Sequence, residues 1–499
     1  MRTNGLYHTL TLLAAALSVS WTLSATPRLT VVIAVDGMSG EALEQMRPYW
    51  KAGGLRTLQE EAQQTLIGYG FDVQGGEETL ATLLTGQMPS QHGVWYPAYF
   101  DRRDKQLHPF FEDPDQAGIG TAEHLSLKRM AFPTLSDLFR IKHGDFAKIY
   151  AVGQASSATL LLAGHAANAC CWLDASSHRW VTTSYYGAGL PAVADEENVS
   201  GRIDESCRTL WMPHMQPSSY LHPTDQERRQ GFSYSVCEVL HNAPKINSLT
   251  VDMALRVTLS EQLGQDDRPD MLLLQLTTLS PKAGSDHLES AEQEDMYTTL
   301  NEYVGFLLDQ LTARVGSEHL QVILTGIPRL GQSASMRERI GLPTRAFYAD
   351  RAGALTSVYL MALHGNERWI DCVWGQSIFL NRQLIEQKGL SLSEVQRQVA
   401  DFLMDFEGIQ YAYPRSEALM VNRVTDCLAK PYIGDVVFGL QPGWQLWQDE
   451  QLPLDCVSDS YVQSLLWWWC PGVEPSKQVP LPQPGMKADD VLPYLINHL

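Results

Sequence analysis

The stretch LTVVIAVDGM, residues 29–38, decides the fold of this chain. Its run of β-branched and other apolar residues is typical of a strand buried on both faces in a parallel sheet. The run ends at Asp36, which places a carboxylate at the carboxyl end of that strand. Ligand sites of open α/β sheets lie at this edge, so Asp36 is the first candidate site residue.

Apolar runs that predict further buried strands recur along the chain. They alternate with stretches in which apolar residues recur every three or four positions, as in amphipathic helices. A strand–helix–strand rhythm of this kind predicts an α/β fold with a mostly parallel sheet and helices on both faces. The further predicted strands are 147–153, 270–278 and 320–326, and the predicted helices include 40–50, 248–264 and 294–316.

Two stretches interrupt this rhythm. Residues from about 95 to about 245 are loop-rich and aromatic, and we expect them to fold over the carboxyl edge of the sheet as a cap insertion. Residues from about 354 to about 440 predict a small late αβ subdomain, in which Ser391 or Ser393 can cap a helix. Residues 471–487 are rich in proline and predict a surface segment before a last short helix.

Length and charge narrow the class of protein. The 499 residues are enough for a large domain with a well-filled core. The formal net charge of -20 argues against a nucleic acid or an anionic membrane surface as partner.

The first 25 residues are typical of a secretory signal peptide. Arg2 gives a positive start, an apolar stretch covers residues 6–23, and the small residues Ser24 and Ala25 suit a cleavage site. An uncleaved anchor is the alternative. We expect cleavage, which leaves residues 26–499 as a periplasmic or secreted chain with no stable membrane insertion.

The sequence contains eight cysteines. An exported chain meets an oxidising compartment, in which disulfides can form. By separation alone, Cys207 with Cys237 and Cys427 with Cys456 are plausible pairs. The adjacent cysteines at 170–171 are more consistent with buried packing residues than with a redox pair.

Together with Asp36, the motif ATLLTGQMPSQHG (81–93) resembles the opening of the alkaline phosphatase superfamily, in its bacterial branch close to the type I phosphodiesterases and nucleotide pyrophosphatases. Three further blocks follow that likeness in order: GGLRTLQEEA (53–62), AGHAANACCWLD (163–174) and DVVFGLQPGWQL (435–446). The resemblance implies a three-layer α/β/α sandwich. It also implies hydrolysis of a phosphate ester through a covalent phospho-threonine at a pair of zinc ions.

The resemblance assigns site positions one by one. The first zinc ligand falls on Asp36, and the nucleophile falls on Gly76, which has no side chain. The His that follows the nucleophile by four residues falls on Leu80. Four other ligand positions carry neither Asp nor His; they are Ser280, Gly284, Ile327 and Pro328. The last ligand, a His in a His-Gly turn, has no counterpart between Trp447 and Trp467. The Lys and Arg that hold the phosphate fall on Ala155 and Ser157.

A single carboxylate is too little for two divalent cations, because zinc sites take three or four protein ligands. We therefore expect no catalytic residue, no bound cofactor and, at most, a residual ligand role for Asp36. The expected protein has lost phosphohydrolase activity and acts by binding a protein or small molecule, or within an envelope assembly. The alternative is a divergent zinc-dependent phosphatase or phosphodiesterase with relocated ligands, drawn from Glu77, Glu78, Thr79, Asp286 and His287.

Several conspicuous residues are better explained by structure than by chemistry. We expect His92 to form local hydrogen bonds in its turn, and His165 with Asn168 to form a polar cluster. The tryptophans at 467–469 predict a strand buried on both faces, with an exposed binding stripe as the alternative. Asp36 itself is expected to persist as a hydrogen-bonded residue at the strand end, without metal.

Overall fold

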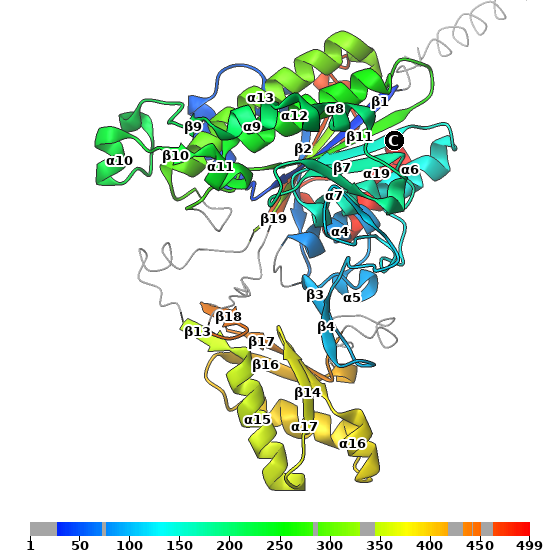
Figure 1. The fold of residues 1–499 in the computed structure, drawn as a ribbon, viewed down its shortest axis with the longest axis vertical. Helices are drawn as coiled ribbons and strands as arrows, with labels where there is room; N and C mark the ends of the chain where they lie inside the picture. Colours follow the sequence, from blue (N-terminus) through cyan, green and yellow to red (C-terminus); the bar gives the residue numbers. More distant parts are fainter. Residues whose placement is uncertain are drawn as a thin grey trace, which may run out of the picture.

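The computed structural model describes residues 27–71, 76–282, 288–329, 345–417, 433–441, 443–450 and 463–499. Its centre is a ten-stranded sheet with helices on both faces (Figure 1), which confirms the predicted α/β fold. The strand order is β20 (Gly485–Lys487), β2 (Gln63–Gly68), β19 (Gln463–Trp469), β12 (Leu320–Ile327), β1 (Leu29–Asp36), β11 (Asp270–Thr277), β6 (Ile149–Gly153), β7 (Ala169–Leu173), β8 (Trp180–Thr183) and β5 (Gly118–Ile119).

The four central strands β12, β1, β11 and β6 are parallel to one another. In this register Asp36 lies opposite Thr277 on one side and Ile327 on the other. The carboxyl ends of β1, β11 and β12 therefore meet at one point of the sheet edge. The predicted strands coincide with these strands to within two residues at either end.

Side chains of β1 alternate between two hydrophobic layers, as the period of a strand requires. Val31, Ile33 and Val35 pack into the layer formed with α2 (Gly40–Met46), α3 (Gly54–Glu61), α12 (Pro244–Ser260) and α13 (Ala291–Val315). Val32 and Ala34 pack into the layer formed with α4 (Glu77–Thr85), α6 (Leu135–His143), α7 (Ser156–Ala163) and α19 (Ala488–His498). The sheet is thus sandwiched between two helical layers.

The range expected to form a cap, 95–245, also builds part of the sheet. It supplies β6 beside β11, and it supplies β7, β8 and β5 toward one sheet edge, where Trp172 and Trp180 are fully buried. Of these strands only β6 was predicted from the sequence. The strands β7, β8 and β5 are short, and their pairing does not follow from a local pattern. The last part of the range lies beside α12 and α13 (Figure 1) and contains α8 (Ala192–Ser200), α9 (Arg202–Cys207), β9 (Leu210–Trp211), α10 (Asp225–Gln230), β10 (Tyr234–Ser235) and α11 (Val236–Val239).

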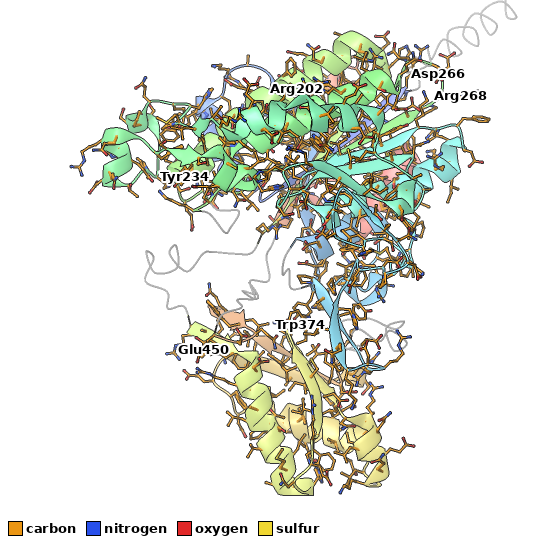
Figure 2. The ribbon with its side chains drawn as sticks, in the orientation of Figure 1. Arg202, Tyr234, Asp266, Arg268, Trp374 and Glu450 are labelled. Atoms are coloured by element: carbon orange, nitrogen blue, oxygen red, sulfur yellow. The ribbon has the colours of Figure 1, made fainter. Side chains whose placement is uncertain are left out.

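A smaller αβ unit extends from one end of the molecule (Figure 1). Its four-stranded sheet has the order β14 (Ile370–Trp374), β15 (Ser377–Leu380), β17 (Val436–Leu440), β16 (Ile409–Pro414), and it packs with α15 (Ala349–His364) and α17 (Leu392–Leu403) around a hydrophobic core of its own. The hairpin of β3 (Ala98–Asp101) and β4 (Gln106–Pro109) reaches this unit from the main body. Trp374 lies at that junction (Figure 2), where its Nε1 donates a hydrogen bond to the carbonyl of Ala98 at 2.9 Å.

Buried positions predicted from the sequence are confirmed. The tryptophans at 467–469 lie in β19 and are at most 7% exposed. Cys170 and Cys171 are buried packing residues, and burial raises the pKa of the Cys171 thiol to about 12. Ser391 is exposed and stands at the N-cap position of α17, but its side chain forms no capping hydrogen bond; its hydroxyl lies 2.9 Å from that of Ser393.

Some sequence predictions fall outside the described residues. They include the signal peptide, because the described residues begin at 27, and the pair of Cys427 with Cys456. Among the described helices, none has the length and apolar character needed to cross a membrane.

Candidate functional site

Asp36 at the end of β1 is paired with a guanidinium group. Nε of Arg329 donates to Oδ1 of Asp36 at 2.7 Å, and Nη2 donates to Oδ2 at 2.6 Å. The side chain of Asp36 is 9% exposed and that of Arg329 is 30% exposed. Both carboxylate oxygens are therefore engaged in a bidentate ion pair, the strongest form of this contact.

Arg329 reaches Asp36 because of the strand register. Ile327, the last residue of β12, lies directly beside Asp36, and its carbonyl accepts a hydrogen bond from the Gly37 nitrogen at 2.9 Å. Pro328 follows and cannot extend the ladder, since it has no N–H group. The chain leaves the sheet there, and the next residue, Arg329, returns its side chain to the strand end.

Gly76, the position assigned to the nucleophile, lies against the same ion pair. It is the N-cap residue of α4 with φ of 96°, a left-handed conformation that L side chains rarely adopt. A Cβ atom there would lie 3.2 Å from Cγ2 of Ile327 and 3.4 Å from Cζ of Arg329. A threonine at this position would strain the backbone and crowd the guanidinium group.

Two further carboxylates, Glu77 and Glu78 at the start of α4, attract the guanidinium. Burial opposes the charged form of Arg329, but the attraction of Asp36, supported by Glu77 and Glu78, outweighs it and raises the pKa of Arg329. Glu77 also accepts a hydrogen bond from Oγ of Ser157 at 3.0 Å. Ser157 is one of the positions that hold phosphate in the resembled family. In this chain the side chain at that position donates its hydrogen bond to the carboxylate of Glu77 instead.

Among the described residues, the positions assigned at this strand edge do not supply the ligands of a pair of zinc ions. Asp36 is occupied by Arg329, Leu80 is buried in the hydrophobic layer, and Ile327 and Pro328 have no donor atoms in their side chains. Ser280 offers a buried hydroxyl, which is not among the usual zinc ligands. Gly284 lies outside the described residues, as do Asp286 and His287 of the relocated set.

His92 has the structural role expected for it. The residue is fully buried, its Nε2 lies 3.1 Å from Oγ1 of Thr82, and its Nδ1 accepts a hydrogen bond from the Val94 nitrogen at 3.1 Å. These contacts fasten the turn after α4 to the helix, and they use both ring nitrogens.

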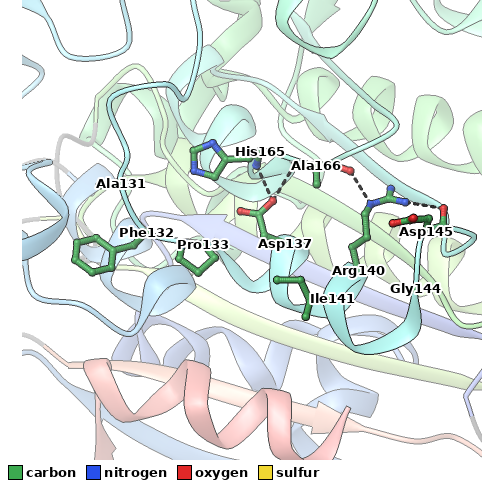
Figure 3. Close-up of a pocket in the computed structure, with 10 residues that line it drawn as sticks. All are labelled: Ala131, Phe132, Pro133, Asp137, Arg140, Ile141, Gly144, Asp145, His165 and Ala166. Carbon is green, nitrogen blue, oxygen red and sulfur yellow. Dashed lines mark hydrogen bonds between the residues drawn. The ribbon is translucent and has the colours of Figure 1, made fainter.

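His165 belongs to a polar cluster at the end of α7, as expected, and it borders a surface pocket of about 470 Å³ (Figure 3). Oδ1 of Asp137 accepts hydrogen bonds from the backbone nitrogens of His165 and Ala166 at 2.7 and 2.9 Å. Nδ1 of His165 lies 3.0 Å from the hydroxyl of Tyr185. Asn168 bonds the Ile149 nitrogen through its side-chain oxygen. The polar groups of this pocket are committed to the fold, so it is not the candidate site.

Arg329 was not among the residues predicted from the sequence. The zinc ligands of the resembled family are Asp and His residues, so a search for such ligands does not consider an arginine. Arg329 also lies in a segment with no periodic pattern of apolar residues, which gives no hint of its position. Its position is the signal that could have identified it. Arg329 directly follows Ile327 and Pro328, the two positions at which the resembled family carries metal ligands.

The sequence of this chain matches a known protein family. The sequence profile described as "Type I phosphodiesterase / nucleotide pyrophosphatase" matches residues 30–462.

Similar sequences are a calcium-transporting ATPase of Myroides odoratus, 23% identical over 84% of this chain and 82% of the relative, and the alkaline phosphatase PhoV of Synechococcus elongatus, 21% identical over 91% and 87%. The alkaline phosphatase PafA of Elizabethkingia meningoseptica is 20% identical over 78% and 76%. A crystal structure of wild-type PafA superposes with a TM-score of 0.80 at 19% identity, covering 93% of this chain and 94% of that chain. This last likeness concerns the fold.

Proposed function

This chain belongs to the type I phosphodiesterase / nucleotide pyrophosphatase family of the alkaline phosphatase superfamily, and we propose that it has lost the family's dimetal phosphohydrolase activity. In this proposal the protein is exported and acts by binding, either to a protein or small molecule or within an envelope assembly. Neither zinc nor another cofactor takes part in its activity.

The ion pair between Arg329 and Asp36 carries the proposal. A buried carboxylate at a strand end needs a cation nearby, because an isolated charge in a protein interior is costly. In a metal-dependent relative that cation is a metal ion. Here a guanidinium group satisfies both oxygens of Asp36, and it lies over the glycine assigned to the nucleophile. The guanidinium therefore compensates the charge of Asp36, which supports a site that works without metal.

The charge around Arg329 also disfavours a phosphate ester as ligand. Asp36, Glu77 and Glu78 all attract the same guanidinium, so the cluster carries more negative than positive charge. The positions assigned to the phosphate-holding Lys and Arg are Ala155 and Ser157, and Ser157 is bonded to Glu77. A neutral or weakly anionic ligand fits this edge better than a phosphate dianion.

The competing function is a divergent metal-dependent phosphatase or phosphodiesterase. The names of PhoV and PafA favour it, since both are alkaline phosphatases. It requires ligands from outside the assigned set. Among its candidates in the described residues, Glu77 and Glu78 are the carboxylates that attract the guanidinium paired with Asp36. For Glu77 to bind a metal, it would have to leave Ser157 and compete with Arg329 for the space.

The deciding experiment measures metal and activity on the same purified chain. We expect elemental analysis to find fewer than two zinc ions per chain. We also expect no chelator-sensitive hydrolysis of an aryl phosphate monoester or diester. Two equivalents of zinc with chelator-sensitive hydrolysis would overturn the proposal. Asp36→Ala is the matched control, because any hydrolysis that survives this substitution comes from a contaminant.

The proposal extends to location and organisation. We propose that residues 1–25 are removed on export and that residues 26–499 act in the periplasm or outside the cell. We propose that the parts of about 95–245 outside the central sheet form the cap insertion and that about 354–440 form the small subdomain. They are the parts through which we expect a partner to be recognised.

A further inference from the structure

Three metal-ligating side chains that take no part in the Asp36 site form a cluster of their own. Nδ1 of His178 is 3.6 Å from Sγ of Cys207 and 3.9 Å from Sγ of Cys237. The three donor atoms all lie within 4.8 Å of one another. The residues come from three segments: the turn between β7 and β8, the end of α9 and α11.

The turn that carries His178 is held in a defined conformation. His178 has φ of 51°, one of three positive values among the described non-glycine residues. Its nitrogen donates to the carbonyl of Asp174 at 3.0 Å, and the Asp174 nitrogen donates to the carbonyl of Arg179 at 2.9 Å. The side chain of Asp174 accepts hydrogen bonds from Ser176 and Ser177 within the same turn. This backbone conformation is uncommon and is maintained by the surrounding bonds.

Two further contacts bring the cysteines to this turn. Arg179 forms a bidentate ion pair with Asp204 on α9, at 2.8 and 2.9 Å, which fixes the helix that ends at Cys207. The short ladder of β9 with β10 pairs Leu210 with Ser235, so the residues shortly before and after it, Cys207 and Cys237, are brought side by side. Both thiols are free, although the sequence suggested a disulfide between them.

The separations match those of a tetrahedral zinc site. With Zn–S bonds of about 2.3 Å and Zn–N bonds of about 2.0–2.1 Å, tetrahedral angles place sulfur and nitrogen about 3.6 Å apart. We propose that His178, Cys207 and Cys237 bind a zinc ion or a similar thiophilic cation. Three protein ligands leave one coordination position for water or for an exchangeable donor. Binding releases the thiol protons, because the thiolate is the ligand form.

The imidazole of His178 distinguishes a metal site from a simple disulfide between the two cysteines. A disulfide joins two sulfur atoms and does not require a third donor, whereas Nδ1 of His178 faces both of them. Cys237 is exposed, and His178 and Cys207 are half-buried, so a cation can reach the cluster from solvent. The inference is independent of the proposed function, since none of these residues takes part in the Asp36 site.

The test uses Co²⁺ and Zn²⁺ added to the full chain after reduction and removal of the reductant. We expect about one equivalent of Co²⁺ to bind with a sulfur-to-cobalt charge-transfer band, and excess Zn²⁺ to displace it. The variant carrying Cys207→Ser and Cys237→Ser should lose the band, and His178→Asn should weaken the affinity by about tenfold or more. Cys470→Ser is the matched control, because Cys470 lies outside the cluster; it should bind as the wild type does.

A second readout keeps the proposal falsifiable if a variant misfolds. In the wild-type chain, Zn²⁺ should protect Cys207 and Cys237, and not Cys372, from alkylation mapped by mass spectrometry. Absence of a stoichiometric cobalt complex, or a band that persists without the two cysteines, would overturn the proposal. A Cys207–Cys237 disulfide in the isolated protein, with no metal uptake after its reduction, would overturn it as well. One equivalent of zinc lost with these cysteines is distinct from the two equivalents that would contradict the proposed function.

Discussion

At the scale of single residues, the strand end of β1 shows how one cation can substitute for another. The carboxylate of Asp36 is buried at the point where three parallel strands end, and its negative charge must be compensated there. Arg329 supplies a charge and a fork of two donors that matches the carboxylate. Because the compensation is complete, Asp36 can be retained in the sequence for stability alone.

This explanation predicts a strong energetic coupling between the two residues. Arg329→Met should lower the free energy of unfolding by about 3 kcal/mol, since it leaves the buried carboxylate of Asp36 without its partner. Adding Asp36→Asn to that variant should recover much of the loss. Urea denaturation of the wild type, the two single variants and the double variant measures the coupling as a double-mutant cycle.

The control for this cycle is Arg397→Met. Arg397 is 68% exposed and pairs with Glu417, which is 47% exposed, so its loss should cost less than about 1 kcal/mol. A similar small effect for Arg329→Met, with no recovery in the double variant, would contradict a role for the pair in stability.

At the scale of elements, the sequence predicted the strands and helices that have a clear local pattern of apolar residues. The strands β1, β11 and β12 are buried along their whole length, so their apolar runs identify them directly. Helix α13 was predicted for the same reason, down to its terminal Gly316. The strands β7 and β8 are short, and their pairing depends on distant residues, which a local pattern does not contain. The cluster of His178 with two cysteines depends on such long-range pairing too.

Helix α13 also carries acidic groups that a sequence pattern does not explain. Its first turns contain Glu292, Glu294 and Asp295, all buried, where carboxylates interact favourably with the helix dipole. Asp295 accepts hydrogen bonds from Nε1 of Trp211 and from the His214 nitrogen, each at 2.7 Å. The acids thus fasten the segment around β9 and β10 to the central layer.

Asp295 should make stability depend on pH. Burial raises the pKa of its carboxyl group, against the hydrogen bonds that it accepts. A group whose pKa is raised by folding binds its proton more tightly in the folded chain. Its stabilising contribution is therefore complete below the unfolded pKa of about 3.9 and is lost as pH rises through the folded value.

The variant Asp295→Asn cannot ionise, so comparison with it isolates this contribution. We expect the difference in unfolding free energy, wild type minus variant, to fall as pH increases from about 4 and then to level off above the raised pKa. Urea denaturation at a series of pH values measures this difference. A difference that rises over the same interval would mean that folding lowers the pKa of Asp295 instead.

At the scale of the whole molecule, the small αβ unit is joined to the main body through the β3–β4 hairpin. Asp435 is fully buried in that unit and accepts hydrogen bonds from Nη2 of Arg102 and Nε of Arg382, each at 2.8 Å. Arg102 comes directly after β3, and the ring of Phe100 in β3 lies 4.9 Å from that of Phe379. A charged contact and an aromatic contact therefore connect the two sheets.

This arrangement predicts that Arg102 controls how firmly the small unit is held. Arg102→Ala removes one of two arginines from the buried carboxylate of Asp435, and it removes the cation–π contact with Phe379. We expect faster amide hydrogen exchange in β15 and β17, whose residues adjoin Asp435, because local opening of this unit becomes less costly. Exchange in β1 and β11 should stay unchanged.

The neighbouring residue provides a matched control for that measurement. Arg103 has the same side chain, but it is 87% exposed and pairs with Asp101 of its own hairpin. Arg103→Ala should therefore leave exchange in β15 and β17 at the wild-type rate, since surface pairs contribute little to stability. Equal protection in both variants would show that the small unit is held by its apolar contacts with β3, such as Phe100 on Phe379. In that case Phe100→Ala, and not Arg102→Ala, would release it.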